Sequence, residues 1–205
     1  MEPFEIVTVK EMHEIVSDAL EPMLDLLGFE CQKPLHWVRG DDAPIRQLFC
    51  LRQWKGGSVA PAWGISLDFV PHVSGSSVKW HRTSKSAIFD LGCDPHDRTM
   101  EFYYTKGKSH VALEAPRVLP AALQAAQSFW LSVCKESELL SAFEAEKARL
   151  AQRRGLGFYN HVQYPVAYAF CLARSGNLSQ ALAELAQSVI DSAAVRARME
   201  ELLRA

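Results

Sequence analysis

The sequence lacks the local signatures that mark most enzyme families. It contains no Gly-x-Ser-x-Gly nucleophile elbow, no phosphate-binding loop and no Gly-x-Gly-x-x-Gly dinucleotide fingerprint. Gly155 and Gly157 follow a predicted helix rather than a strand, which is the wrong context for a nucleotide site. Motifs therefore assign no catalytic residue, and we expect neither an enzyme nor a bound cofactor.

The chain is also poor in paired cysteines and in excess charge. Its five cysteines are odd in number and scattered without a Cys-x-x-Cys pair, which argues against a disulfide framework or a structural zinc site. With 22 basic and 24 acidic residues, the net charge of -2 is not typical of a protein that coats nucleic acid or an anionic membrane. No apolar run is long enough to span a bilayer, and the acidic start does not resemble a secretory signal. We expect a cytoplasmic protein with no membrane contact.

What the chain does have is a tryptophan-rich region, from Phe29 to Tyr104, that contains four of its five tryptophans. Within it, Ala62–Phe69 alternates large apolar residues with small or polar ones, so Trp63, Ile65, Leu67 and Phe69 share one face of a predicted strand. An apolar sheet face must be covered, and helical patterns flank the region on both sides. The alternation therefore predicts a sheet whose tryptophan face is the core.

Further strands are expected where apolar runs are bounded by turn residues, at 35–39, 45–54, 78–82, 86–91 and 101–105, with Pro71 ending the pairing of the Trp63 strand. The sequence thus predicts an α+β fold with an antiparallel, meander-like sheet of about five to six strands covered by helices. We expect an α+β domain over residues 1–115 and a helical extension over 116–205 that docks on the sheet or on a partner.

Helix signals are clearest at the two ends of the chain. Thr8 and Glu11 form a predicted capping box that opens an acidic amphipathic helix, and Gly28 suits its left-handed end. From Pro120 onward the apolar residues recur with helical spacing, and Asp191 is the predicted cap of the last helix. Residues 168–185 resemble a single tetratricopeptide unit, but one copy buries no core, so we interpret them as an antiparallel helical hairpin.

Residues 8–115 resemble a bacterial family known as domain of unknown function 4304. The resemblance is carried by a helix ending in Leu-Leu-Gly-Phe at 26–29, by Leu-His-Trp-Val at 35–38, by Phe-Cys-Leu-Arg-Gln-Trp-Lys at 49–55 and by Trp-Gly-Ile-Ser-Leu at 63–67. It implies an α+β fold. It brings no established activity, cofactor or catalytic residue to this chain.

One candidate site is the loop Asp90–Asp97 together with His81. A carboxylate, a thiolate and an imidazole that converge on one loop can bind a divalent metal and activate water, which would make the chain a metal-dependent hydrolase. The weak candidate ligands are Asp90, Cys93, Asp94 and His96. Because Asp-Pro and Gly-Cys-Asp are ordinary turn sequences, ordinary loop chemistry is the preferred interpretation.

A second candidate is the stretch Lys79–Lys85, where basic residues surround Trp80 as they would on a platform for single-stranded nucleic acid. The alternative is a strand in which Trp80 packs inward and its basic neighbours are solvated. The chain has no overall positive charge, so we prefer the inward-packing interpretation and do not expect nucleic acid as the partner.

The third candidate is a polar surface on the sheet. Asp68 stands in an otherwise apolar strand and is expected to pair with Arg46 or Arg52 on a neighbouring strand. Trp54 and Trp63 would add aromatic anchors at its rim. Taken with the missing catalytic motifs, this favours a non-enzymatic interaction module that binds a protein partner or a second copy of itself, with the binding residues Arg46, Arg52, Trp54, Asp68, Trp80 and His81.

Overall fold

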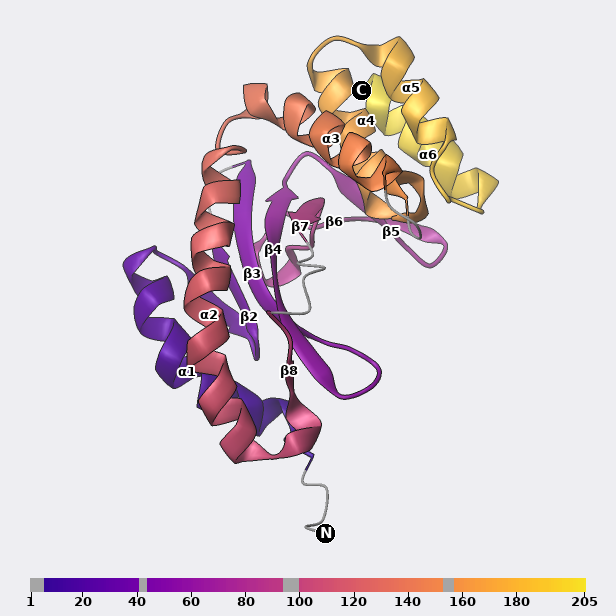
Figure 1. Cartoon of the computed structure of the whole chain (residues 1–205). Coiled ribbons are helices and arrows are strands. Elements are labelled where there is room, and N and C mark those ends of the chain that lie inside the picture. Colours follow the sequence, from indigo (N-terminus) through magenta and orange to yellow (C-terminus); the bar gives the residue numbers. More distant parts are fainter. Residues whose placement is uncertain (1–5, 41–43, 94–99, 153–156) are drawn as a thin grey trace. The chain divides into compact units, whose positions relative to one another are not determined.

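The computed structural model describes residues 6–40, 44–93, 100–152 and 157–205. The elements lie in the order α1 (Val9–Leu26), β1 (Glu30–Lys33), β2 (His36–Arg39), β3 (Ile45–Gln53), β4 (Ser58–Leu67), β5 (Pro71–Ser74), β6 (Ser77–Trp80), η1 (Ser84–Ser86), β7 (Leu91–Cys93), β8 (Phe102–Tyr103), η3 (Tyr104–Lys106), α2 (Lys108–Leu131), α3 (Glu136–Ala151), η4 (Phe158–Asn160), α4 (Gln163–Arg174), α5 (Leu178–Ala186) and α6 (Ala193–Arg204) (Figure 1).

The predicted α+β class and antiparallel sheet are confirmed. The main sheet has six strands in the order β1-β2-β3-β4-β7, with β8 paired to β4, so its first four strands are sequential neighbours as in a meander. Strands β5 and β6 form a separate two-stranded sheet. Beyond residue 135 the regular structure of the described residues is the helices α3, η4, α4, α5 and α6, so the predicted C-terminal helices are also confirmed.

The chain divides into two compact units, each assembled from separate segments. Unit 1 contains residues 1–41, 47–64 and 92–130, and unit 2 contains residues 42–46, 65–91 and 131–205. Strands β3 and β4 therefore each contribute residues to both units. Residue 115, where we expected a boundary, lies inside α2.

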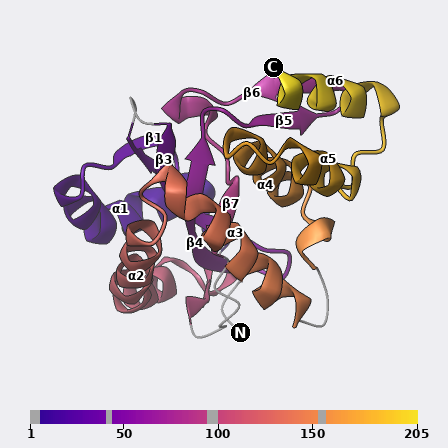
Figure 2. The ribbon, with the colours of Figure 1, turned by 90° about the horizontal axis from the view of Figure 1, so that it is seen from above.

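Unit 1 is a sheet covered by two helices. The predicted capping box opens α1, with the Thr8 side chain bonded to the Glu11 amide and the Glu11 carboxylate bonded to the Thr8 amide. Helices α1 and α2 lie on the same side of the sheet (Figures 1 and 2). The Trp130 indole of α2 donates a 3.0 Å hydrogen bond to the Gly64 carbonyl and packs on Phe29 at 4.8 Å between ring centroids. Apolar contact and a satisfied indole together fix α2 on β4.

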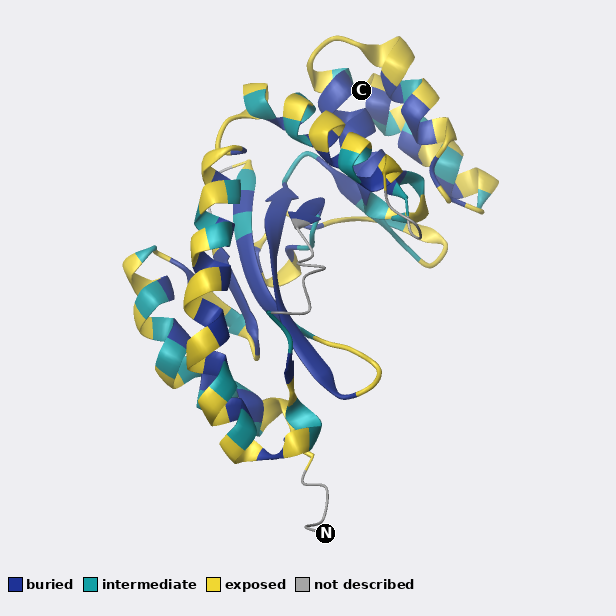
Figure 3. Cartoon of the chain, viewed as in Figure 1, coloured by how far each residue is buried: buried dark blue, intermediate teal, exposed yellow. Residues whose placement is uncertain are grey.

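Strand β4 differs from the prediction because both of its faces are buried. Every residue from Ser58 to Leu67 is buried, as the unbroken dark blue strand in Figure 3 shows. The alternation also ends earlier than expected. The Val70 amide bonds to the Leu67 carbonyl, so Asp68 and Phe69 lie in a turn and Phe69 is only half-buried. The small and polar residues between the large ones are therefore shielded from solvent as well.

Four other expectations are wrong. Pro71 begins β5 instead of ending the pairing, a position that proline tolerates because the first residue of an edge strand needs no ladder donor. Residues 86–90 form no strand, and pairing resumes only at Leu91. Helix α2 begins at Lys108 and includes Pro120, because its buried stripe extends back to Val111. The cap of α6 is Ser192 rather than Asp191.

A buried histidine on β2 predicts acid sensitivity. Burial, followed by the charges of Lys33 and Arg52, lowers the pKa of His36 from 6.5 to about 4. Between these values the unfolded chain binds a proton that the folded chain does not, so the free energy of unfolding falls as the pH decreases from 6.5 to 4. At about 1.4 kcal/mol per pKa unit, the loss approaches about 3 kcal/mol. Urea unfolding across this range measures it.

The variant His36→Phe removes the titrating group and is expected to flatten this pH dependence. His110→Gln, at a half-exposed histidine, is the matched control and keeps the slope of the parent chain. Equal slopes in the parent chain and in His36→Phe would show that His36 is not the source.

Candidate functional site

A surface that combines aromatic, aliphatic and arginine side chains lies in unit 2, next to the hairpin β5–β6. The hairpin pairs Pro71 with Trp80 and Ser74 with Ser77, which leaves Gly75 and Ser76 as a two-residue turn. Gly75 has φ +60°, the left-handed conformation that such tight hairpin turns require. The hairpin packs against α4 and α6. This tight turn fixes the position of Trp80 at the end of β6.

A groove of about 300 Å³ opens beside Trp80, and we call it the arginine groove. Strand β6, helix α4, helix α6 and the turn after β4 all contribute to it, through Phe69, Trp80, Arg82, Phe170, Ala173, Arg174, Leu202, Leu203 and Ala205. Its lining is apolar and aromatic except for two guanidinium groups. No aspartate or glutamate is among the lining residues, so the side chains that face the groove carry positive charge.

Arg82 lines this groove with its guanidinium group over the Trp80 ring. Its guanidinium carbon lies 3.8 Å from the centroid of the Trp80 ring, and its Nε donates a 3.1 Å hydrogen bond to the Asp68 carbonyl. No carboxylate within the described residues pairs with it. An arginine stacked on tryptophan keeps its terminal N–H groups free to form a forked pair with an oxyanion. Trp80 is 38% exposed, so the predicted inward packing of this side chain is wrong.

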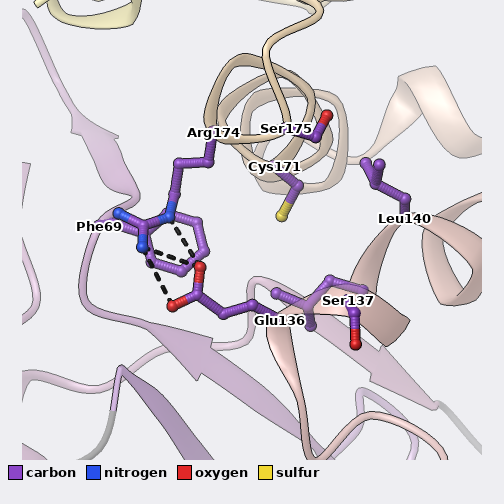
Figure 4. A pocket seen from close by; sticks show the side chains of 8 residues that line it. Phe69, Glu136, Ser137, Leu140, Cys171, Arg174 and Ser175 are labelled. Atoms are coloured by element: carbon purple, nitrogen blue, oxygen red, sulfur yellow. Dashed lines mark hydrogen bonds and ion pairs between the residues drawn. The ribbon is translucent and has the colours of Figure 1, made fainter.

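Arg174 forms the wall between the arginine groove and a neighbouring cavity of about 220 Å³. Its guanidinium lies over the Phe69 ring, 4.4 Å from the centroid, and forms a two-pronged pair with Glu136 at 2.9 and 3.0 Å (Figure 4). Cys171 lines the second cavity, where burial raises the pKa of its thiol far above the ordinary range. Because Glu136 neutralises Arg174, Arg82 carries the uncompensated charge of the groove.

The turn that supports Arg82 is fixed by an ion pair. Arg46, at the start of β3, pairs with the Asp68 carboxylate, and its second terminal nitrogen donates a 2.6 Å hydrogen bond to the Arg82 carbonyl. The Arg46 side chain is only 2% exposed, whereas Asp68 is 29% exposed. The expected pairing of Asp68 with Arg46 is therefore present, but Arg46 is a buried support beneath the surface rather than a contact residue.

A fully buried pair lies deeper in the same unit. His81 Nε2 lies 2.7 Å from Asp90 Oδ2, and neither side chain is exposed to solvent. The Asp90 carboxylate also accepts hydrogen bonds from the Leu67 amide at 2.6 Å and from the Gln163 side chain at 2.5 Å. Burial raises the pKa of Asp90 even though three donors stabilise its ionised form. The cluster joins β4, the loop before β7 and α4, which is a structural role.

His72 extends this cluster toward the surface. Its Nδ1 lies 3.3 Å from Nδ1 of His81. In neutral His81 that donates from Nε2 to Asp90, Nδ1 can only accept, and the proton between the two rings then belongs to Nδ1 of His72. Burial, followed by the charge of His81, lowers the pKa of His72. The carboxylate thus sets the tautomers of two imidazoles in series.

The remaining predicted site residues lie elsewhere. Arg52 and Trp54 belong to unit 1, where Trp54 is 40% exposed, and Trp63 is buried rather than at a rim. Asp94 and His96 lie outside the described residues, as does the side chain of Cys93, and Asp90 and His81 line neither of the two cavities. No local pattern marks Phe170 and Arg174 of the groove or His72 and Gln163 of the buried cluster, because tertiary packing brings each of them to its place.

Comparisons with models of protein families, with curated proteins and with solved structures found no match to this chain. Within the described residues, no helix has both the length and the apolar character needed to cross a bilayer.

Proposed function

We propose that this chain is a non-enzymatic protein-interaction module and that the arginine groove is its binding surface. The observation that carries the proposal is the stacked Arg82–Trp80 pair, which places an uncompensated guanidinium beside apolar walls. Tryptophan and arginine are the side chains most enriched among residues that dominate protein interfaces. A cytoplasmic location and membership of the domain of unknown function 4304 family are part of the same proposal.

The groove favours a peptide segment that combines an apolar side chain with a carboxylate. Phe69, Phe170 and Leu203 offer apolar contact, while Arg82 offers a forked donor to one carboxylate. Single-stranded nucleic acid is less well matched. Its affinity depends on neutralising several phosphates, and the groove supplies one uncompensated arginine in a chain of net charge -2.

A site-specific photo-crosslinker tests the proposal. Installed in place of Trp80 in the native cell, it is expected to give a discrete adduct with one partner protein or with a second copy of this chain. Trp54 is the matched control, because its 40% exposure is close to the 38% of Trp80 and it lies in the other unit. The crosslinker at position 54 is expected to give no such adduct. Mass spectrometry of the adduct identifies the partner.

Binding of the purified partner then tests the role of the charge. Arg82→Ala is expected to weaken affinity about tenfold, as expected when one charge-assisted pair is lost, while Arg39→Ala at an exposed arginine of unit 1 leaves it unchanged. Equal adducts at positions 54 and 80, or none at 80, contradict the proposal. So does an oligonucleotide that quenches tryptophan fluorescence and whose binding weakens with salt, because that result assigns the groove to nucleic acid.

A further inference from the structure

A second cluster of reactive side chains lies in unit 1, where α1 meets β1. His13 and Glu21 stand on one stripe of α1 with Ser17 between them, at intervals of four residues, and Cys31 lies on β1. One ligand-type atom from each of His13, Glu21 and Cys31 lies within 4.8 Å of the other two. Among the described residues, this is the one set of three histidine, cysteine or acidic side chains whose donor atoms converge in this way.

The distances approach those of a metal centre. His13 Nε2 lies 3.9 Å from the Cys31 sulfur. For a zinc–sulfur bond of about 2.3 Å and a zinc–nitrogen bond of about 2.0 Å at a tetrahedral angle, these two ligand atoms stand about 3.5 Å apart. A movement of a few tenths of an ångström closes the difference between His13 and Cys31. The Glu21 oxygen, which lies within 4.8 Å of the other two atoms, must come closer by a change of its side-chain rotamer. Cys31 is exposed and Glu21 is half-buried, so both side chains can make these movements and the site is open to an ion.

The surroundings of His13 also suit a ligand. Nδ1, the ring nitrogen that faces away from Cys31, lies 3.2 Å from the Ser17 hydroxyl, and the ring packs on Trp37 at 5.8 Å between centroids. A histidine that binds metal through Nε2 carries its proton on Nδ1 and donates it to a neighbouring acceptor, a role that the Ser17 oxygen can fill. The longer contact from the Leu35 amide to Nδ1, at 3.5 Å, is lost in that tautomer. Ser17 and Trp37 thus hold the ring with Nε2 directed at the cluster.

We propose that His13, Glu21 and Cys31 form a binding site for a tetrahedral divalent transition-metal ion, with Zn²⁺ as the best match. Sulfur and imidazole ligands select zinc-like ions over Mg²⁺ and Ca²⁺, which prefer oxygen, and the carboxylate supplies the third bond. Water occupies the fourth position. On binding, the Cys31 S–H bond breaks, its proton passes to solvent and the thiolate bonds to the metal, so about one proton is released for each ion.

Cobalt titration of the full-length, reduced chain tests the site. Co²⁺ is expected to bind at one ion per chain and to produce a thiolate-to-cobalt charge-transfer band that Zn²⁺ abolishes by displacement. Cys31→Ser is expected to remove the band. Cys134→Ser is the matched control, because Cys134 is also exposed but lies in unit 2, and it should leave the band intact.

The Co²⁺ affinity of single variants tests the contribution of each of the other ligands. His13→Gln and Glu21→Gln are expected to weaken Co²⁺ binding at least tenfold, and Ser17→Ala about tenfold, the size of effect usual for a group that orients a ligand. Glu21→Gln keeps the sulfur bond, so it retains the band at saturating Co²⁺. A band that survives Cys31→Ser or is lost in Cys134→Ser overturns the proposal, as does unchanged affinity in both His13→Gln and Glu21→Gln.

Discussion

Asp90→Ala is expected to lower the free energy of unfolding by about 4 kcal/mol. The carboxylate is fully buried and accepts hydrogen bonds from the Leu67 amide, His81 and the Gln163 side chain. Alanine leaves the Leu67 amide and His81 Nε2 buried without this acceptor, and water cannot restore their solvation. The half-buried Gln163 side chain keeps its bond to the Pro71 carbonyl. Urea unfolding at neutral pH measures the change.

Two variants make this prediction specific. Asp90→Asn can place its amide oxygen where Oδ2 stands, which keeps the acceptor shared by the Leu67 amide and His81 Nε2. Only the Gln163 side chain then loses its acceptor at position 90, so the loss is expected to be about half as large. Asp191→Ala, at an exposed aspartate of the same unit, should remain within about 0.5 kcal/mol of the parent chain. A cost below about 1 kcal/mol for Asp90→Ala would mean that the cluster does not hold unit 2 together.

Asp68→Ala is expected to lower the free energy of unfolding by about 3 kcal/mol. Removing one partner of a buried ion pair leaves the other charge uncompensated, at a typical cost of about 3–5 kcal/mol. Arg46 is buried in this way, but it keeps its bond to the Arg82 carbonyl, and Asp68 is partly exposed. Both facts place the expected cost at the low end of the range. Urea unfolding again measures it.

The double variant Arg46→Met with Asp68→Leu distinguishes the contribution of the ion pair to stability from the contribution of side-chain packing. Removing both charges also removes the stranded guanidinium, so the double variant is expected to be more stable than Asp68→Ala. Asp18→Ala, at an exposed aspartate of α1, serves as the control for loss of an unpaired surface carboxylate. If the double variant is as unstable as Asp68→Ala or less stable, shape rather than charge dominates at this position.

The parts of the fold that were predictable are those set by neighbours in sequence. The Thr8–Glu11 capping box closes within one helical turn, and Gly28 ends α1 with φ +77°, so a few residues contain the whole cause. The strands β2 and β3 likewise follow from local alternation and turn residues. For strand β4 the alternation predicts one buried face, and small or polar residues such as Gly64 and Ser66 give no local sign that the other face is buried too.

The candidate site was also predictable only where its residues are neighbours in sequence. Residue type and local pattern single out Trp80, His81, Arg46 and Asp68. They do not show which of these side chains face solvent. Trp80 is 38% exposed although Arg82 covers one face of its ring, and Arg46 is buried because the turn after β4 folds over it. Arg174 and Gln163 come from α4, more than seventy residues beyond β6, where no local pattern can link them to the site.

The proposed function and the proposed metal site involve different units. Substitutions at Arg82 act on the arginine groove in unit 2, whereas substitutions at Cys31 act on the cluster in unit 1. Loss of metal binding in Cys31→Ser with unchanged partner binding would therefore leave the interaction module intact. Loss of partner binding in Arg82→Ala with unchanged Co²⁺ binding would leave the proposed metal site intact.

The interleaved order of the two units has a consequence for biosynthesis. Strand β4 ends at Leu67, but α2, which covers it in unit 1, is complete only at Leu131. At about 5–20 residues per second, a ribosome needs several seconds to cover that interval. During that time β4, all of whose residues are buried in the folded chain, has left the exit tunnel without its helical cover. The nascent chain therefore exposes Trp63, Ile65 and Leu67 to solvent until α2 emerges.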